Sequence, residues 1–296
     1  MASARSARSG DGVAAGGLLR WAWVALCFAL PALLVVVPIL AFLVQSFWYV
    51  EDGEIVRRAT LANYVRLATD DTSLPIFLKT CRLAAEVTVI TLLIGYPIAF
   101  LIWTRGERTR YLLLLAFVVP LFMSYIIKVY AIRALLGRSG LLNQVLLQLG
   151  ILDQPSTVLL FNLTAVKISL ALILIPFAIL PVFVALERIP LSLAHASADL
   201  GGNPWQTFRR VILPLSAPGA MTGAAFTFVL AIGDFVTPQM VGGTTGFTFG
   251  RVIQSQFGMA FNWPFGAALS VLLLLLVFAA LAVAGGLGRL LGGPRP

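Results

Sequence analysis

The stretch "LAHASADLGGNPWQTFRRVILPLSAPG", residues 193–219, is polar and basic and lies between two long apolar segments. Gly201 and Gly202 favour the end of a short helix, because glycine readily adopts the left-handed conformation found at helix C-termini. Asn203-Pro204 then marks a turn, and "WQTFRRVILPL" predicts an amphipathic helix that leads into the next apolar segment. We therefore expect a short helix that lies across one face of a membrane and is held between two spans.

The composition assigns the chain to the membrane. Of its 296 residues, 59% are hydrophobic and 11% are charged, whereas a soluble domain is close to half apolar and a quarter charged. A bilayer core requires about 20 apolar residues per helix. The segments that meet this length are residues 21–46, 83–104, 111–133, 158–186, 217–237 and 264–288. We predict an all-α polytopic membrane protein with about six transmembrane helices.

The basic residues indicate how the chain is oriented. The net charge is +9, and loops rich in Lys and Arg stay in the cytoplasm. The mixed loop 47–82 weakens this signal, but the other cytoplasmic candidates still outweigh Arg138 and Arg251 on the opposite side. We therefore expect both termini and the opening stretch in the cytoplasm. The expected organisation is a disordered cytoplasmic tail (1–20), a membrane domain (21–290) containing the polar link 187–216, and a C-terminal tail (291–296).

The sequence argues against several other classes of function. No basic stripe with base-stacking aromatics lies outside the spans, so we expect no nucleic-acid partner. The single histidine, His195, and the two cysteines, Cys27 and Cys81, lack the spacing of metal ligands. The sequence has no Gly-x-Ser-x-Gly or His-Glu-x-x-His motif and no Walker phosphate loop. We expect no catalytic residue, no metal, no cofactor and no ATP bound by this chain.

At the opening stretch the chain resembles the permease subunits of ABC importers. Their signature is Glu-Ala-Ala, three residues, Gly, nine residues, Ile, one residue and Leu-Pro. Here the same spacing reads His195-Ala196-Ser197, Gly201, Val211 and Leu213-Pro214, so that His195 replaces the Glu and Ser197 replaces the second Ala. The resemblance implies that this is the coupling helix, which docks in a groove on an ATPase subunit. The coupling residues that it implies are His195, Ala196, Ser197, Asp199, Gly201, Leu213 and Pro214.

A wider resemblance covers roughly residues 20–290. "FVVPLFMSYIIKVYAIRALLGRSGLLNQVL" and "QFGMAFNWPFGAALS" are similar to the branch of the family that includes the spermidine/putrescine permeases of the B type. This resemblance implies import of a polyamine or similar small solute through a bacterial inner membrane. The implied partners are two cytoplasmic ATPase subunits, a second permease in a heterodimer, and a periplasmic or lipid-anchored binding protein. The alternatives are a permease for another small solute, and an ATP-independent secondary transporter, which would need an ion-coupling cluster inside its spans.

Polar residues expected near membrane depth are candidates for the translocation path: Asp234, Glu86, Lys128 and Tyr125. A charge at such a position usually faces a cavity or a partner, and Asp234 or Glu86 could attract a cation. Each could instead form a structural ion pair. Lys128, Arg133 and Lys167 could supply that pair or extend to the interface with only their stems buried. Tyr125 could stack on a ligand cation or anchor the protein at the membrane boundary.

Overall fold

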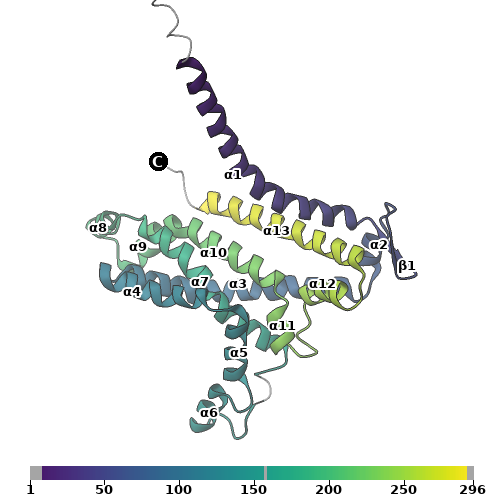
Figure 1. The fold of residues 1–296 in the computed structure, drawn as a ribbon. Coiled ribbons are helices and arrows are strands. Elements are labelled where there is room, and N and C mark those ends of the chain that lie inside the picture. Colours follow the sequence, from purple (N-terminus) through teal and green to yellow (C-terminus); the bar gives the residue numbers. More distant parts are fainter. Residues whose placement is uncertain (1–8, 157–158, 292–296) are drawn as a thin grey trace, which may run out of the picture.

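Long helices lying side by side form the centre of the molecule. The computed structural model describes residues 9–156 and 159–291. In Figure 1 the parallel set is α3 (Ser73–Trp103), α7 (Leu163–Glu187), α10 (Leu213–Gly233) and α13 (Trp263–Leu291), and α1 (Ser9–Gln45) follows α13. α7 makes its most extensive contacts with α3 and α10, and it is the most deeply buried of the spans. α3 and α10 therefore flank α7, while α13 packs on α10 and α1 packs on α13.

The shorter elements lie at the two ends of this bundle and between them (Figure 1). At one end, the α8 end, are α8 (Leu191–Asp199), α9 (Pro204–Thr207) and the π-helix η2 (Phe208–Ile212). At the opposite end, the hairpin end, are β1 (Tyr49–Glu51), β2 (Glu54–Val56), α2 (Ala62–Thr69) and α12 (Phe249–Gly258). The remaining elements are α4 (Glu107–Val118), the 3-10 helix η1 (Val119–Phe122), α5 (Tyr125–Leu136), α6 (Leu141–Gln148) and α11 (Val236–Val241).

The all-α membrane architecture is confirmed, but the span predicted over 111–133 is broken. After α4 and η1 the chain turns by 101° into α5. Pro120 removes a backbone donor, and Met123 and Ser124 are extended, with ψ angles of 146° and 135°. Five helices in the described part of the chain are long and apolar enough to cross a membrane, or six if the bent pair counts as one span.

α3 begins at Ser73, ahead of the start predicted at residue 83. The Asp70 carboxylate accepts hydrogen bonds from the Ser73 hydroxyl and from the backbone N–H groups of Thr72 (3.2 Å) and Ser73 (3.1 Å). These hydrogen bonds hold the pKa of Asp70 below its ordinary value, and the bond from the Ser73 hydroxyl contributes most. A capped turn outside the apolar segment therefore extends the helix beyond what hydropathy predicts.

The tails expected at both ends of the chain remain predictions. Residues 1–8 and 292–296 lie outside the described residues. α1 begins at Ser9, ahead of the predicted start of the membrane domain at 21, and α13 ends at Leu291. Between these limits the helices follow the order that the apolar segments predict.

A small β-hairpin joins α1 to α2, and the sequence reading had not predicted it. Its strands pair antiparallel, with Glu51 opposite Glu54. The turn residues Asp52 and Gly53 have φ angles of 52° and 83°, as a two-residue hairpin turn requires. The Asp-Gly pair was the available signal. The Asn63 amide then fixes α2 beside the hairpin by donating to the backbone oxygens of Ser46 (2.9 Å) and Trp48 (2.6 Å).

Glycines hold α7 close to its two neighbours. A Cβ added to Gly95 of α3 would lie 3.1 Å from the Cβ of Ala178. A Cβ added to Gly219 of α10 would lie 2.4 Å from the Cβ of Ala185 and 2.5 Å from the carbonyl oxygen of Pro181. Small residues let helix backbones approach closely in lipid, where apolar burial provides no drive for association. A side chain at position 219 would therefore force α7 and α10 apart.

Gly219→Leu should lower the stability of the bundle by about 2 kcal/mol or more, because overpacking a tight contact forces the backbone to move. The measurement is the thermal midpoint of the detergent-purified chain. Gly286→Leu is the matched control, since a Cβ at Gly286 meets no atom within 4 Å. Equal midpoints for the two variants would show that the contact at Gly219 is not tight.

Candidate coupling surface and translocation path

The short helix predicted from the opening stretch is present as α8, and glycine ends it. The N–H of Gly201 donates to the oxygen of Ala198 (2.9 Å), and the N–H of Gly202 donates to the oxygen of Ser197 (2.9 Å). Gly201 has a φ of +80°. This bonding pattern with a left-handed residue is a Schellman cap. The predicted end of the helix is therefore confirmed in detail.

α9 begins directly after this cap. The Asn203 side chain accepts from the backbone N–H of Gln206 (2.8 Å), and the Gln206 side chain accepts from the N–H of Asn203 (3.1 Å). This reciprocal pair is a capping box. α9 then passes through the π-helix η2 into α10 without a break. α9, η2 and the fifth predicted span therefore form one helical rod, residues 204–233.

A hydroxyl pair ties α8 to this rod. The Ser197 and Thr207 hydroxyls lie 2.8 Å apart, and Thr207 is buried. Ser197 stands where the family signature has alanine, so this chain makes a bond that the signature residue could not. A Cβ on Gly202 would lie 2.7 Å from the Ser197 oxygen, which shows how closely the turn folds back on α8.

Aromatic side chains extend the connection to α3. The Trp205 ring stacks on that of Phe208 at 5.6 Å between centroids. Phe208 in turn meets Phe100 at 5.5 Å and Tyr96 at 6.0 Å edge to face. The Tyr96 hydroxyl lies 2.6 Å from that of Ser216 on α10. Movement of α9 would therefore act on α3 and α10 together.

The predicted coupling residues divide into two groups. His195, Ala196, Asp199 and Gly201 are exposed on α8 and its cap, with Ser197 half-buried beneath them. Leu213 and Pro214 instead form the first turn of α10, beyond α9 and η2. The structure does not place them on the α8 surface.

Two exposed apolar residues on this surface were missed by the sequence reading. The side chain of Leu200 is 90% exposed, and that of Trp205 is 66% exposed. They flank the glycine turn between α8 and α9. The signature has no fixed residue at either position, but a leucine and a tryptophan within a polar link were a usable signal for contact with a partner.

Asp234 and Tyr125 come together where α10 ends. The Asp234 carboxylate accepts from the backbone N–H groups of Val236 (3.1 Å) and Thr237 (3.2 Å). The Tyr125 hydroxyl lies 2.9 Å from that of Thr237, the residue whose backbone N–H binds Asp234. No Lys, Arg or His side chain in the described residues lies within ion-pair distance of Asp234. The hydrogen-bond donors to its carboxylate are all neutral groups.

Glu86 and Lys128 lie in different surroundings. The Glu86 carboxylate pairs with Arg82 (2.8 Å) and with Lys167. Of the two roles considered for Glu86, the structure therefore shows the ion pair. The Lys128 ammonium lies 5.6 Å from the ring centroid of Tyr125, and Arg133 lies at the same distance over Phe161. Lys128 therefore shares Tyr125 with Asp234.

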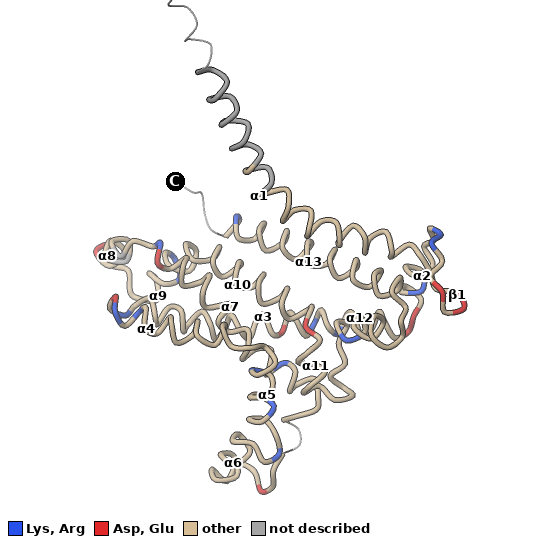
Figure 2. Tube along the Cα trace, in the orientation of Figure 1, with Lys and Arg blue, Asp and Glu red and all other residues tan. Residues whose placement is uncertain are grey.

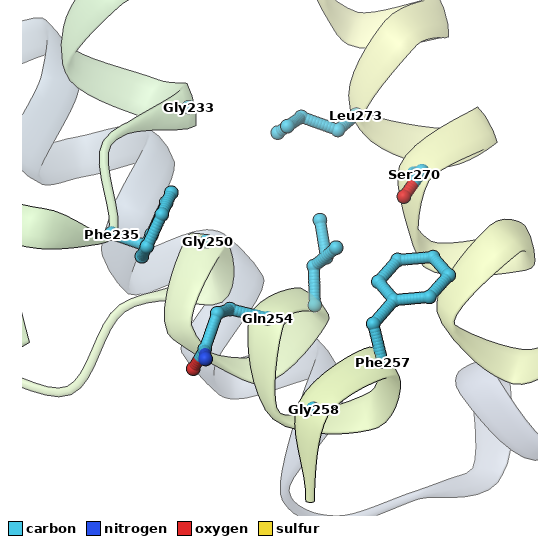
Figure 3. Close-up of a pocket in the computed structure, with 9 residues that line it drawn as sticks. Gly233, Phe235, Gly250, Gln254, Phe257, Gly258, Ser270 and Leu273 are labelled. Carbon is cyan, nitrogen blue, oxygen red and sulfur yellow. The ribbon is translucent and has the colours of Figure 1, made fainter. Parts of the chain in front are cut away.

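A cleft of about 460 Å³ lies beside Asp234, between the end of α10, α12 and α13. Gly233 and Phe235, the residues on either side of Asp234, line it together with Gln254, Phe257 and Ser270. Figure 3 shows these side chains around one cavity. Apolar and aromatic walls with a few polar groups are typical of a small-molecule site.

The sequence profile described as "Binding-protein-dependent transport system inner membrane component" matches residues 21–289. The chain belongs to this family. The resemblance read from the signature is thus confirmed, and the chain is a multi-pass inner-membrane permease of an ABC importer.

Curated relatives match over most of the chain. The spermidine/putrescine transport system permease protein PotB of Escherichia coli (strain K12) is 35% identical over 260 residues, which cover 88% of this chain and 94% of PotB. The inner membrane ABC transporter permease protein YdcU of the same organism is 36% identical over 266 residues, covering 84% of this chain and 83% of YdcU. These relatives are transport permease subunits.

A solved structure shares the fold. A chain of a bacterial alginate ABC transporter in complex with a pentasaccharide-bound periplasmic protein superposes with a TM-score of 0.64 at 16% identity, covering 97% of both chains. At this identity the similarity concerns the fold alone. The bundle described above is therefore the fold of an ABC transporter permease.

Proposed function

We propose that this permease imports a polyamine or a similar small organic cation. The identity to spermidine/putrescine permeases over most of the chain supports this cargo. In the proposed assembly, a second permease pairs with this chain and two cytoplasmic ATPase subunits hydrolyse the ATP. A periplasmic or lipid-anchored binding protein delivers the solute.

The proposed orientation places the α8 end and both termini in the cytoplasm. Figure 2 shows that charged residues gather mainly at the ends of the bundle, with few along the long helices. Basic residues close to the ends of the spans favour the cytoplasmic side. Arg105, Arg108, Arg209 and Arg210 lie at the α8 end. The proposed membrane domain is then 21–290 with the coupling region 187–216.

The observation that carries the coupling role is the capped, exposed helix α8 joined to α10. ATP-driven movement of α8 would reach α10 through the Ser197–Thr207 bond and the continuous rod. We include Leu200 and Trp205 in the proposed docking surface, because both are exposed apolar residues beside the Gly201 turn. His195 would contribute an exposed polar contact in place of the signature's glutamate.

The proposed path runs past Asp234 rather than Glu86. Glu86 is already paired with two cations, so its charge is compensated within the protein. Asp234 receives hydrogen bonds from neutral backbone groups, and no cation of the described residues pairs with it. An ammonium group of the cargo could provide the missing cation, with Tyr125 beside it for a cation–π contact. Because Lys128 lies at the same ring, its positive charge would repel a cargo ammonium group placed close to it.

The first test is reconstitution of the chain in lipid with the products of its neighbouring genes. We expect an ATPase to co-purify, and spermidine together with the binding protein to stimulate hydrolysis and uptake. An ATPase that ignores polyamines would refute the cargo, and a stable preparation without any ATPase would refute the coupling role.

Gly201→Leu should abolish substrate-stimulated ATPase activity while the protein stays in the membrane. Leucine at a φ of +80° costs about 1–2 kcal/mol, so the cap should open and reorient α8. The matched control is Gly150→Leu, because Gly150 has a φ of +67° and equally open surroundings at the end of α6. Normal stimulated hydrolysis in Gly201→Leu would contradict the role of this turn.

Asp234→Asn should lower uptake efficiency for a polyamine by roughly tenfold, in line with the loss of a charged hydrogen-bond partner. Initial uptake rates over a range of spermidine concentrations provide the measurement. Glu86→Gln is the control, and should leave the concentration dependence unchanged because that charge is compensated. If both variants changed uptake alike, Asp234 would have no special place on the path.

A further inference from the structure

A large groove opens between the α8-end halves of α7, α10 and α13. It encloses about 1510 Å³. Its walls are apolar and include Val184 of α7, Leu215 and Phe226 of α10, and Leu281 of α13. Because three spans form these walls, the groove lies at the depth of the lipid acyl chains.

The groove follows from how tightly its floor is packed. At Gly219 the backbones of α7 and α10 touch, and a Cβ there would lie 2.4 Å from that of Ala185. α13 approaches α10 at Gly288, where an added Cβ would lie 3.6 Å from the Cβ of Met221. Beyond the floor the lining residues include Ala284 and Gly285, which are too small to fill the space between the diverging helices.

Two arginines stand at the mouth of the groove. Arg188 follows the last residue of α7, and Arg289 lies in the last turn of α13. Both line the groove, and no Asp or Glu does so. In the described ranges neither guanidinium makes an ion pair. Glu187, next to Arg188, bonds instead to the Tyr111 hydroxyl at 2.7 Å.

We propose that this groove binds an anionic phospholipid of the cytoplasmic leaflet. The phosphate would lie between Arg188 and Arg289, since guanidinium groups bind phosphate oxygens with strong charge-assisted bonds. An acyl chain would lie along the apolar walls. Basic pockets between spans on the cytoplasmic side are suited to anionic headgroups. The assignment of the leaflet rests on the proposed orientation.

The charge of the mouth distinguishes this occupant from others. A cationic cargo would be repelled by both arginines, so the groove does not fit the proposed solute path. An apolar helix of a second permease would cover the walls but would leave the two guanidinium groups without a counter-charge. An anionic lipid would cover the apolar walls with an acyl chain and would provide the counter-charge for both arginines.

A lipid in this groove would also touch the base of the coupling helix. Ile189, Pro190 and Leu193, which lead into and form the start of α8, line the same groove. Occupancy would therefore support α8 from its membrane side. Transport should then depend on the fraction of anionic lipid in the bilayer.

The test is native mass spectrometry of the full-length chain, purified with the subunits that accompany it and titrated with phosphatidylglycerol or phosphatidylcholine. We expect one phosphatidylglycerol to bind with clear preference. Each basic residue near an anionic lipid strengthens binding by about fivefold, so Arg188→Gln with Arg289→Gln should weaken it by about 25-fold. Gly285→Leu, which places a side chain in the groove, should weaken the binding of both lipids.

The matched control is Arg105→Gln with Arg108→Gln, which removes the same charge from exposed positions at the same end of the bundle. It should retain phosphatidylglycerol binding. Equal losses in the two double variants would overturn the proposal in favour of unspecific attraction, and so would equal binding of the two lipids. A second permease that excludes lipid from the groove would overturn it too. These readouts do not use transport, so they stand apart from the test of cargo.

Discussion

The contact of α7 with α10 at Gly219 sets the geometry on which both proposed sites depend. In a bilayer, apolar burial cannot pull helices together, so the rod that contains α10 is placed by backbone-to-backbone fit. The rod begins next to α8 and ends next to Asp234. Because α7 holds it at Gly219, a displacement of α8 cannot be absorbed by separation of the two helices there and has to pass along α10. The tight packing at Gly219 therefore also provides the mechanical connection between α8 and the far end of α10.

The carboxylates of Glu86 and Asp234 differ in the groups that surround them. Glu86 forms ion pairs with Arg82 and Lys167, so its negative charge is compensated by two cations of the same protein. Asp234 instead accepts hydrogen bonds from two backbone amides and has no ion-pair partner among the described residues. Only the second arrangement leaves a carboxylate free to pair with a cation from outside the chain, as the proposed path requires.

The sequence allowed much of the bundle and of α8 to be predicted, for reasons that are local. Apolar length marks the spans, and the Gly201–Gly202 pair marks the end of α8 through a backbone conformation that other residues avoid. The break after Pro120 was not predicted, because a proline in a membrane helix can kink the helix or end it, and tertiary contacts decide which. The pairing of Asp234 with Tyr125, and of Glu86 with Lys167, joins residues far apart in the chain, which no local pattern reveals. Leu200 and Trp205 were not predicted, because the family signature has no fixed residue at either position.

The π-helix η2 has a geometric consequence for the relation between α8 and the membrane. A wide turn of this kind accommodates one residue more than an α-helix does, and one residue corresponds to about 100° of rotation around a helix axis. Residues 204–207 are thus turned relative to α10 by an angle that a regular helix would not allow, which brings Trp205 onto Phe208 and the Phe208 ring onto α3. If the wide turn migrated along the rod, the face that α9 presents would change without any change in the length of the span. Torsion, and not only translation, is therefore available to this permease as a way of passing motion from α8 and α9 into the membrane-spanning part of the rod.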